Sequence, residues 1–141
     1  MSPHFSLDEL TFSAYAERHG IDNTPPAKVL ANLQRLAYGL ERVRELLGQR
    51  IHVESGYRSP ILNGWVGGSK KSAHMQGYAA DFRCPGFGSP LQVCRAIRDS
   101  DIEFDQIINE MTWIHLSFDP QNRCECLTKK NAFAPYVKGL V

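Results

Sequence analysis

A long amphipathic stretch between Pro26 and Leu47 constrains the fold of this chain more than any other feature. Its apolar residues recur every three or four positions, the spacing that places them on one face of an α-helix. They are Val29, Leu30, Leu33, Leu36, Ala37, Leu40, Val43, Leu46 and Leu47. Pro26 suits the first turn of a helix, and Gly48 suits the position just past its end. We expect this helix to support the fold and assign it no chemistry.

Shorter elements surround this helix. Ser6 followed by Glu9 predicts a capped helix start, and Ser59-Pro60 predicts a short helix that ends before Gly67. A further helix is expected from Leu91 to Ile97. Alternating apolar and polar residues predict strands over 51–54, 78–84, 104–109, 112–118 and 124–128, with a tight turn near Glu110 and Met111. The pattern favours an α+β fold in which helices pack on one face of a small, mostly antiparallel sheet.

Length and composition narrow the class of protein. A chain of 141 residues with 43% hydrophobic and 22% charged residues is typical of one globular domain, here 1–141. The net charge of +1 disfavours a nucleic-acid binder. No apolar run is long enough for membrane insertion, and the N-terminus lacks the pattern of a signal peptide. We therefore expect a protein made in the cytoplasm that does not insert into a membrane. The sequence leaves the oligomeric state open, and a monomer is expected.

Cysteine usage gives no metal site. The four cysteines are expected to be reduced thiols in a cytoplasmic protein, and the isolated pair Cys124 and Cys126 is too closely spaced for zinc.

His74 and Asp81 are the first candidate metal ligands. Imidazole and carboxylate suit a borderline ion such as zinc, and Gly77 permits a tight turn between the two residues. The small Ala79, on the same strand face as Asp81, would leave space above an ion. The alternative is a capped turn followed by a solvated aspartate.

His115 is the third candidate ligand. In a strand over 112–118, Trp113, His115 and Ser117 share one face, and Ile114, Leu116 and Phe118 share the other, apolar face. His115 would then face a cleft beside Trp113. Two histidines and one carboxylate leave a fourth tetrahedral position for water, as in catalytic zinc sites. The alternative is a core histidine that donates to a backbone carbonyl.

Three motifs together resemble the zinc D-Ala-D-Ala carboxypeptidases and L-alanyl-D-glutamate peptidases, which share the hedgehog/DD-peptidase fold. They are Ser55-Gly56-Tyr57-Arg58-Ser59, then Ser72-x-His74-x-x-Gly77-x-Ala79-x-Asp81, then Trp113-x-His115. The chain is most similar to the single-domain versions of phages and prophages. The resemblance implies Zn²⁺ held by His74, Asp81 and His115, and hydrolysis of peptides in peptidoglycan stems. An enzyme that acts on the bacterial wall without a signal peptide would need another route out, such as phage-induced membrane permeabilisation or delivery in a virion.

Arg58 and Glu110 are the candidate catalytic residues. The resemblance implies that Arg58 binds a substrate carboxylate or carbonyl, and a guanidinium can make two parallel hydrogen bonds to a carboxylate. A surface arginine that closes a turn is the alternative. Some branches of the family place an acidic general base three residues before the last ligand, where this chain has Thr112. Glu110 is therefore our candidate base, with Asp105 as the other nearby carboxylate.

Other function classes share this fold. A binding module could keep the fold and the zinc without catalysis, and a phage structural component could use the domain only to dock on the wall. The sequence does not indicate which peptide bond would be cut.

Overall fold

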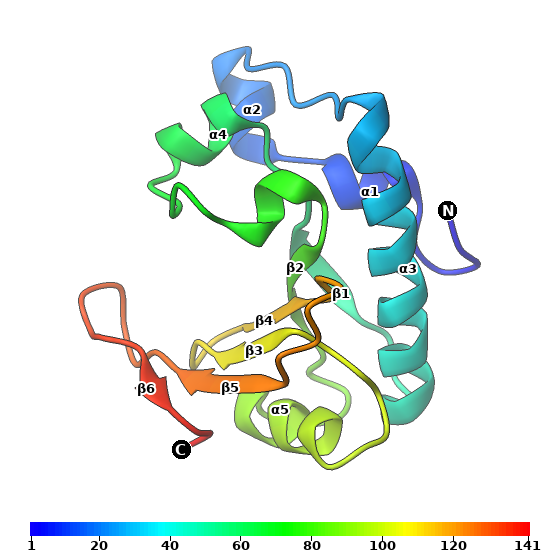
Figure 1. Ribbon diagram of the computed structural model, residues 1–141, viewed down its shortest axis with the longest axis vertical. Coiled ribbons are helices and arrows are strands. Elements are labelled where there is room, and N and C mark those ends of the chain that lie inside the picture. Colours follow the sequence, from blue (N-terminus) through cyan, green and yellow to red (C-terminus); the bar gives the residue numbers. More distant parts are fainter.

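The computed structural model describes residues 1–141 and contains five α-helices, one 3-10 helix and six strands (Figure 1). The helices are α1 (Leu7–Thr11), α2 (Ala14–His19), α3 (Ala27–Leu47), α4 (Pro60–Trp65), the 3-10 helix η1 (Ala73–Gln76) and α5 (Pro90–Arg98). The strands are β1 (His52–Ser55), β2 (Ala79–Arg83), β3 (Gln106–Asn109), β4 (Ile114–Ser117), β5 (Glu125–Thr128) and β6 (Val137–Lys138).

The six strands form one sheet in the order β1-β2-β4-β3-β5-β6. Every neighbouring pair is antiparallel except β3 and β5, which run parallel. Strands β3 and β4 form a hairpin whose turn holds Glu110, where the sequence predicts a tight turn. The expected α+β class with a mostly antiparallel sheet is confirmed.

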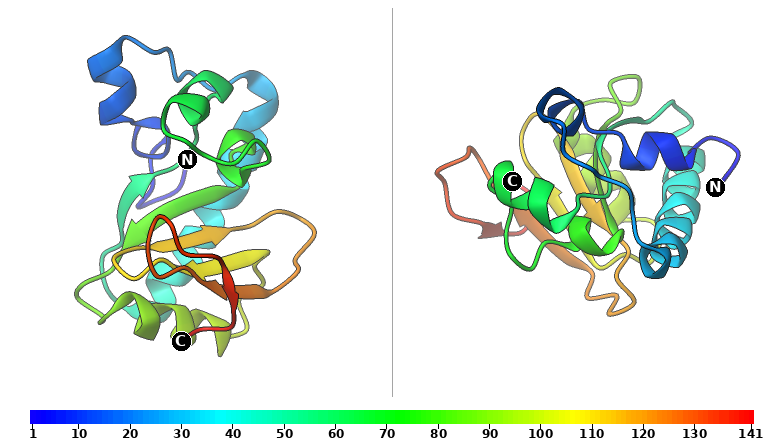
Figure 2. Two further views of the ribbon diagram at one scale, coloured as in Figure 1. Left: turned by 90° about the vertical axis from the view of Figure 1, so that its left-hand side faces the viewer. Right: turned by 90° about the horizontal axis from the view of Figure 1, so that it is seen from above.

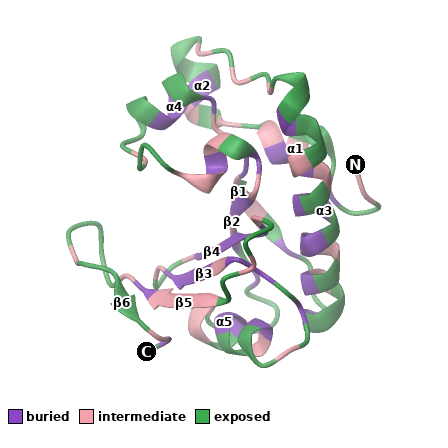
Figure 3. Cartoon of the chain, viewed as in Figure 1, coloured by how far each residue is buried: buried purple, intermediate pink, exposed green.

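One face of the sheet forms the hydrophobic core with α3 and α5. Ala80 and Phe82 of β2 and Ile114 and Leu116 of β4 belong to this core together with the apolar face of α3. Figure 3 shows buried stretches on both α3 and the sheet. Helix α3 approaches the end of β4 so closely that a Cβ atom at Gly39 would lie 2.5 Å from the ring of Phe118, the residue after β4. Because strand side chains alternate, the residues between these core positions point to the opposite face.

Three elements were not expected from the sequence. The N-terminal helix ends at Thr11 because Phe12 is extended, and Ser13 then caps a separate helix α2. The 3-10 helix η1 replaces the loop expected around His74. The two-residue strand β6 is too short to leave a periodic signal. No helix has the length and apolarity needed to cross a membrane.

Candidate active site

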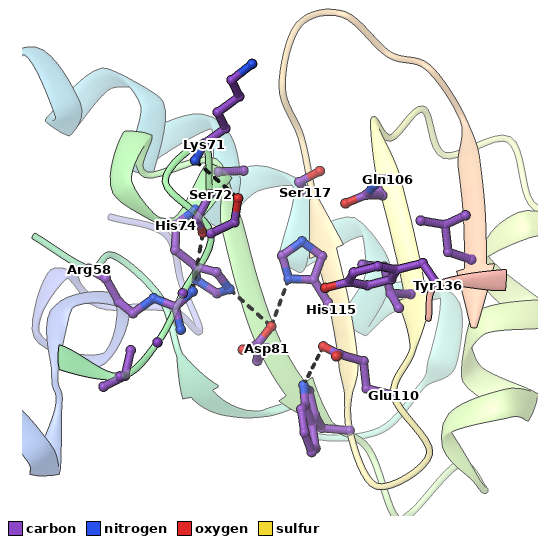
Figure 4. Close-up of a pocket in the computed structure, with 18 of the residues that line it drawn as sticks. Arg58, Lys71, Ser72, His74, Asp81, Gln106, Glu110, His115, Ser117 and Tyr136 are labelled. Atoms are coloured by element: carbon purple, nitrogen blue, oxygen red, sulfur yellow. Dashed lines mark hydrogen bonds and ion pairs between the residues drawn. The ribbon is translucent and has the colours of Figure 1, made fainter. Parts of the chain in front are cut away.

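A cavity of about 540 Å³ lies on the sheet face opposite the core (Figure 4). Its floor comes from β2, β3 and β4, which contribute Asp81, Ile108 and His115. One wall is the segment from α4 to η1, and the facing wall includes Tyr136 from the C-terminal segment. The cavity therefore joins parts of the chain that are far apart in sequence.

The three candidate metal ligands converge at this cavity. The Asp81 Oδ1 atom lies 3.2 Å from His74 Nε2 and 2.9 Å from His115 Nδ1, and one donor atom from each residue lies within 4.8 Å of the others. Asp81 and His115 meet because they are direct register partners on β2 and β4. His74 reaches the same point from η1.

The orientation of His74 is set by the Ser55–Ser59 motif. His74 Nδ1 donates a hydrogen bond to the Gly56 carbonyl at 2.7 Å, which leaves Nε2 free to face Asp81. This position requires glycine, because a Cβ atom at Gly56 would collide with the Leu10 carbonyl. A hydrogen bond from the second ring nitrogen to a carbonyl is the usual way in which proteins orient a metal-binding histidine.

Burial and the neighbouring charges favour the protonation states of His74 and Asp81 that bind metals. Burial lowers the pKa of His74, an effect that Asp81 only partly offsets, so the imidazole tends to be neutral. Burial of Asp81 opposes ionisation, but the two histidines outweigh it and hold the pKa of Asp81 well below its usual range. Neutral imidazole and ionised carboxylate are the ligand forms. Two nitrogen donors and one oxygen donor with an oriented histidine fit zinc.

Arg58 lies beside this group, half-buried in the wall of the cavity. Its Nη2 atom donates to Ser72 Oγ at 3.3 Å, whereas its Nε atom is buried without a hydrogen-bond partner. Asn23 fixes the loop that carries Arg58, because its amide bonds the Tyr57 carbonyl and the Ser59 N–H. Burial lowers the pKa of Arg58, but a guanidinium stays charged at any working pH.

Ser72, whose partner the sequence leaves open, accepts hydrogen bonds from Arg58 and from the His74 N–H at 3.2 Å. It therefore links the arginine to the helix that carries the histidine.

Glu110 also lines the cavity, from the turn between β3 and β4. Its Oε2 atom accepts a hydrogen bond from Trp113 Nε1 at 2.9 Å, which fixes the carboxylate. Burial and then the Asp81 carboxylate raise the pKa of Glu110. Asp105, the other nearby carboxylate in sequence, does not line the cavity and instead accepts hydrogen bonds from Arg123 at 2.8 and 2.9 Å.

Two features of the cavity were not foreseen in the sequence. Trp113 was expected beside the cleft, but its role as a donor to Glu110 depends on how the hairpin turns. Tyr136 belongs to no motif and reaches the cavity only through the path of the C-terminal segment, so no local signal indicates it.

Comparison with known proteins agrees with this geometry. Residues 3–117 match the family model described as Peptidase M15. A search of curated proteins found no match. The matched region includes the candidate metal ligands, Arg58 and Glu110, and M15 peptidases are zinc-dependent. Because the match covers well over half of the chain, this protein belongs to the M15 family of zinc D-Ala-D-Ala carboxypeptidase-like peptidases.

Proposed function

We propose that this protein is a zinc-dependent peptidase that hydrolyses peptide bonds in the stem peptides of bacterial peptidoglycan. One observation carries the proposal: His74, Asp81 and His115 converge in a cavity that also holds Arg58 and Glu110 (Figure 4). A site that only binds metal would need the three ligands but neither the half-buried arginine nor a fixed carboxylate.

The three ligands would hold the metal through His74 Nε2, His115 Nδ1 and an Asp81 carboxylate oxygen. A zinc ion held there would act as a Lewis acid, polarising the peptide carbonyl and making a water molecule easier to deprotonate. The structure supports this ligand set because the Gly56 carbonyl holds His74 in the tautomer that presents Nε2.

Arg58 would bind the substrate. Its buried Nε atom has no protein partner, and a carboxylate could accept from this atom and from a neighbouring guanidinium nitrogen. Stem peptides carry such carboxylates at a D-alanine terminus or a D-glutamate side chain. Binding there would place the adjoining peptide bond beside the metal ligands.

Glu110 would transfer the proton. Trp113 holds Oε2, so Oε1 is left to accept a proton from the attacking water and return it to the leaving amine. Burial and Asp81 raise the pKa of Glu110, which moves it towards the range in which one group can act as base and then as acid.

Mass spectrometry of muropeptides after digestion of purified peptidoglycan tests the proposal. We expect new cleavage products with the wild-type protein and none after a chelator removes the metal. Glu110→Gln preserves the acceptor for Trp113 and removes the base, so we expect it to retain zinc but lose at least ~10²-fold in turnover.

Glu103→Gln is the matched control, because Glu103 is exposed and lies outside the cavity. It should digest peptidoglycan like the wild type. Wild-type protein that binds peptidoglycan in a sedimentation assay without cleaving it would overturn the proposal in favour of a wall-binding or phage structural module.

A further inference from the structure

The last part of the chain lies outside the region that matches the family and still contributes to the cavity. We call residues 129–141 the C-terminal strap. After β5 the strap loops outward and returns as β6, which pairs with β5. Figure 2 shows it crossing in front of the sheet, and Tyr136, directly before β6, lines the cavity.

The strap is anchored at several points, so the position of Tyr136 is defined. Thr128 Oγ1 donates to the Gly139 carbonyl at 2.8 Å, and the Gly139 N–H donates to the Cys126 carbonyl at 2.8 Å. Leu140 is only 7% exposed and belongs to the hydrophobic core. The backbone that follows Tyr136 is therefore attached both to β5 and to the core.

The ring of Tyr136 is held by Lys129, the residue directly after β5. The Lys129 Nζ atom lies 4.6 Å from the ring centroid, a cation–π distance, and donates to the Ala134 carbonyl at 2.5 Å. Figure 4 shows the phenol projecting across the cavity beside His115, on the side opposite Arg58, with no hydrogen bond to another residue drawn. The hydroxyl is thus directed at the metal-ligand group without a protein partner there.

The other neutral donors on this side are partly engaged or buried. One N–H of the Gln106 amide donates to Glu125 at 2.5 Å, which turns the amide towards β5, and Ser117 is 1% exposed. Tyr136 keeps its own proton, because burial and the carboxylates of Glu110 and Asp81 raise its pKa. A protonated phenol therefore points into the cavity beside the candidate metal ligands.

We infer that Tyr136 is a catalytic residue, whose hydroxyl donates a hydrogen bond to the carbonyl oxygen of the scissile peptide as negative charge develops on it. The inference rests on the proposed function. The strap fixes the hydroxyl in place, and its hydrogen bond strengthens as the carbonyl becomes an oxyanion. The bond therefore stabilises the transition state more than the bound substrate. Glu110 moves the proton, Arg58 binds the carboxylate, and Tyr136 stabilises the reacting oxygen.

Tyr136→Phe removes the hydroxyl and retains the ring over Lys129. We expect kcat on a purified muropeptide to fall about 10²-fold, the usual loss for one donor to an oxyanion, with KM within about threefold. Zinc content and melting temperature should not change. Tyr38→Phe is the matched control, because Tyr38 on α3 is 59% exposed against 57% for Tyr136 and lies outside the cavity.

Binding of a phosphinate analogue of the cleaved bond gives a second readout by calorimetry. Tyr136→Phe should bind this transition-state analogue about as much more weakly as its kcat/KM falls, while binding of the product peptide stays the same. Wild-type kcat in Tyr136→Phe, or equal losses for analogue and product, would overturn this inference alone. A wild-type protein that does not cleave peptidoglycan would overturn the proposed function and this inference with it.

Discussion

Arg58 combines a half-buried charge with an unused donor. Ser72 accepts a hydrogen bond from only one terminal nitrogen of Arg58, and the Nε atom of Arg58 has no partner. An unpaired polar atom in a protein interior costs free energy unless a ligand satisfies it. Its neighbours Asp81 and Glu110 offset part of the cost of burying the charge.

Arg58→Lys therefore tests whether the shape of the cation matters. Lysine keeps the charge but cannot offer two parallel donors. We expect kcat/KM on muropeptides to fall roughly ten- to hundredfold, equivalent to about 1.5–3 kcal/mol for one charge-assisted contact, with unchanged zinc content. Arg42→Lys on the exposed side of α3 should have no effect. A fully active Arg58→Lys protein would show that Arg58 does not clamp the substrate.

At the scale of elements, α1 and the loop after β1 pack together to orient the metal site. The Tyr57 N–H donates to the Leu10 carbonyl at 2.7 Å, while the preceding Gly56 carbonyl accepts from His74. Only glycine fits between these two contacts, since a side chain at Gly56 would meet the α1 backbone. The end of α1 thus determines where the His74 ring lies.

Gly56→Ala should weaken both the fold and the metal site. Forcing a methyl group against backbone should lower the free energy of unfolding by about 1–3 kcal/mol, and displacing the carbonyl should lower zinc affinity by roughly 10–100-fold. Denaturant unfolding and a competition titration with a zinc indicator measure the two effects. Gly64→Ala in α4, where a Cβ atom meets nothing within 4 Å, is the control. Equal zinc affinity in the two variants would contradict the proposed role of Gly56.

Asp105 also holds two elements together, because it attaches the segment after β4 to the start of β3. Its carboxylate accepts from the Arg123 side chain and N–H, and its backbone N–H donates to the Ser117 carbonyl. The hydrogen bonds from Arg123 lower the pKa of Asp105 below its usual value although burial opposes this. The carboxylate is used for structure, which leaves Glu110 as the candidate base.

Asp105→Asn should destabilise the protein in a pH-dependent way. A carboxylate with a lowered folded-state pKa stabilises the fold above its unfolded pKa of about 3.9, and this contribution is lost as pH falls through the folded value. We expect a loss of about 1–2 kcal/mol at neutral pH that shrinks below pH ~4. Urea unfolding from pH 7 to pH 3 measures it. A pH-independent difference would mean that the ion pair does not contribute.

At the scale of the whole molecule, the candidate metal site joins the segment of α4 and η1 to the sheet. The residue His74 belongs to the segment of α4 and η1, whereas Asp81 and His115 belong to the sheet. The unfolded chain would not bring these three ligands together and would not bind the metal. Metal binding would therefore stabilise the folded state.

Removal of zinc should therefore lower the melting temperature. At a free zinc concentration 100 times the dissociation constant, binding contributes about 2.7 kcal/mol, which corresponds to a fall on the order of 5–10 °C with a chelator. Asp81→Asn should bind less zinc and lose this response, whereas His52→Ala on the exposed surface of β1 should keep it. A chelator effect of the same size in Asp81→Asn and wild type would contradict the site.

The sequence by itself determined the features that depend on neighbours along the chain. Apolar spacing is enough to locate α3, because a helix places residues three and four apart on one side. Alternation assigns Ile114 and Leu116 to the core and His115 to the opposite face. The spacing of His74 and Asp81, with a glycine turn between them, already suggested a shared ligand site.

The tertiary structure decided everything that depends on register or on the path of a loop. Asp81 lies opposite His115 only because β2 and β4 pair in that register, and a shift of one residue would turn one of them to the core. The Trp113 bond to Glu110, the capture of Asp105 by Arg123 and the approach of Tyr136 have no periodic signal. Each joins residues through a turn or a strap, and such contacts are fixed by the packing of the whole chain rather than by local sequence.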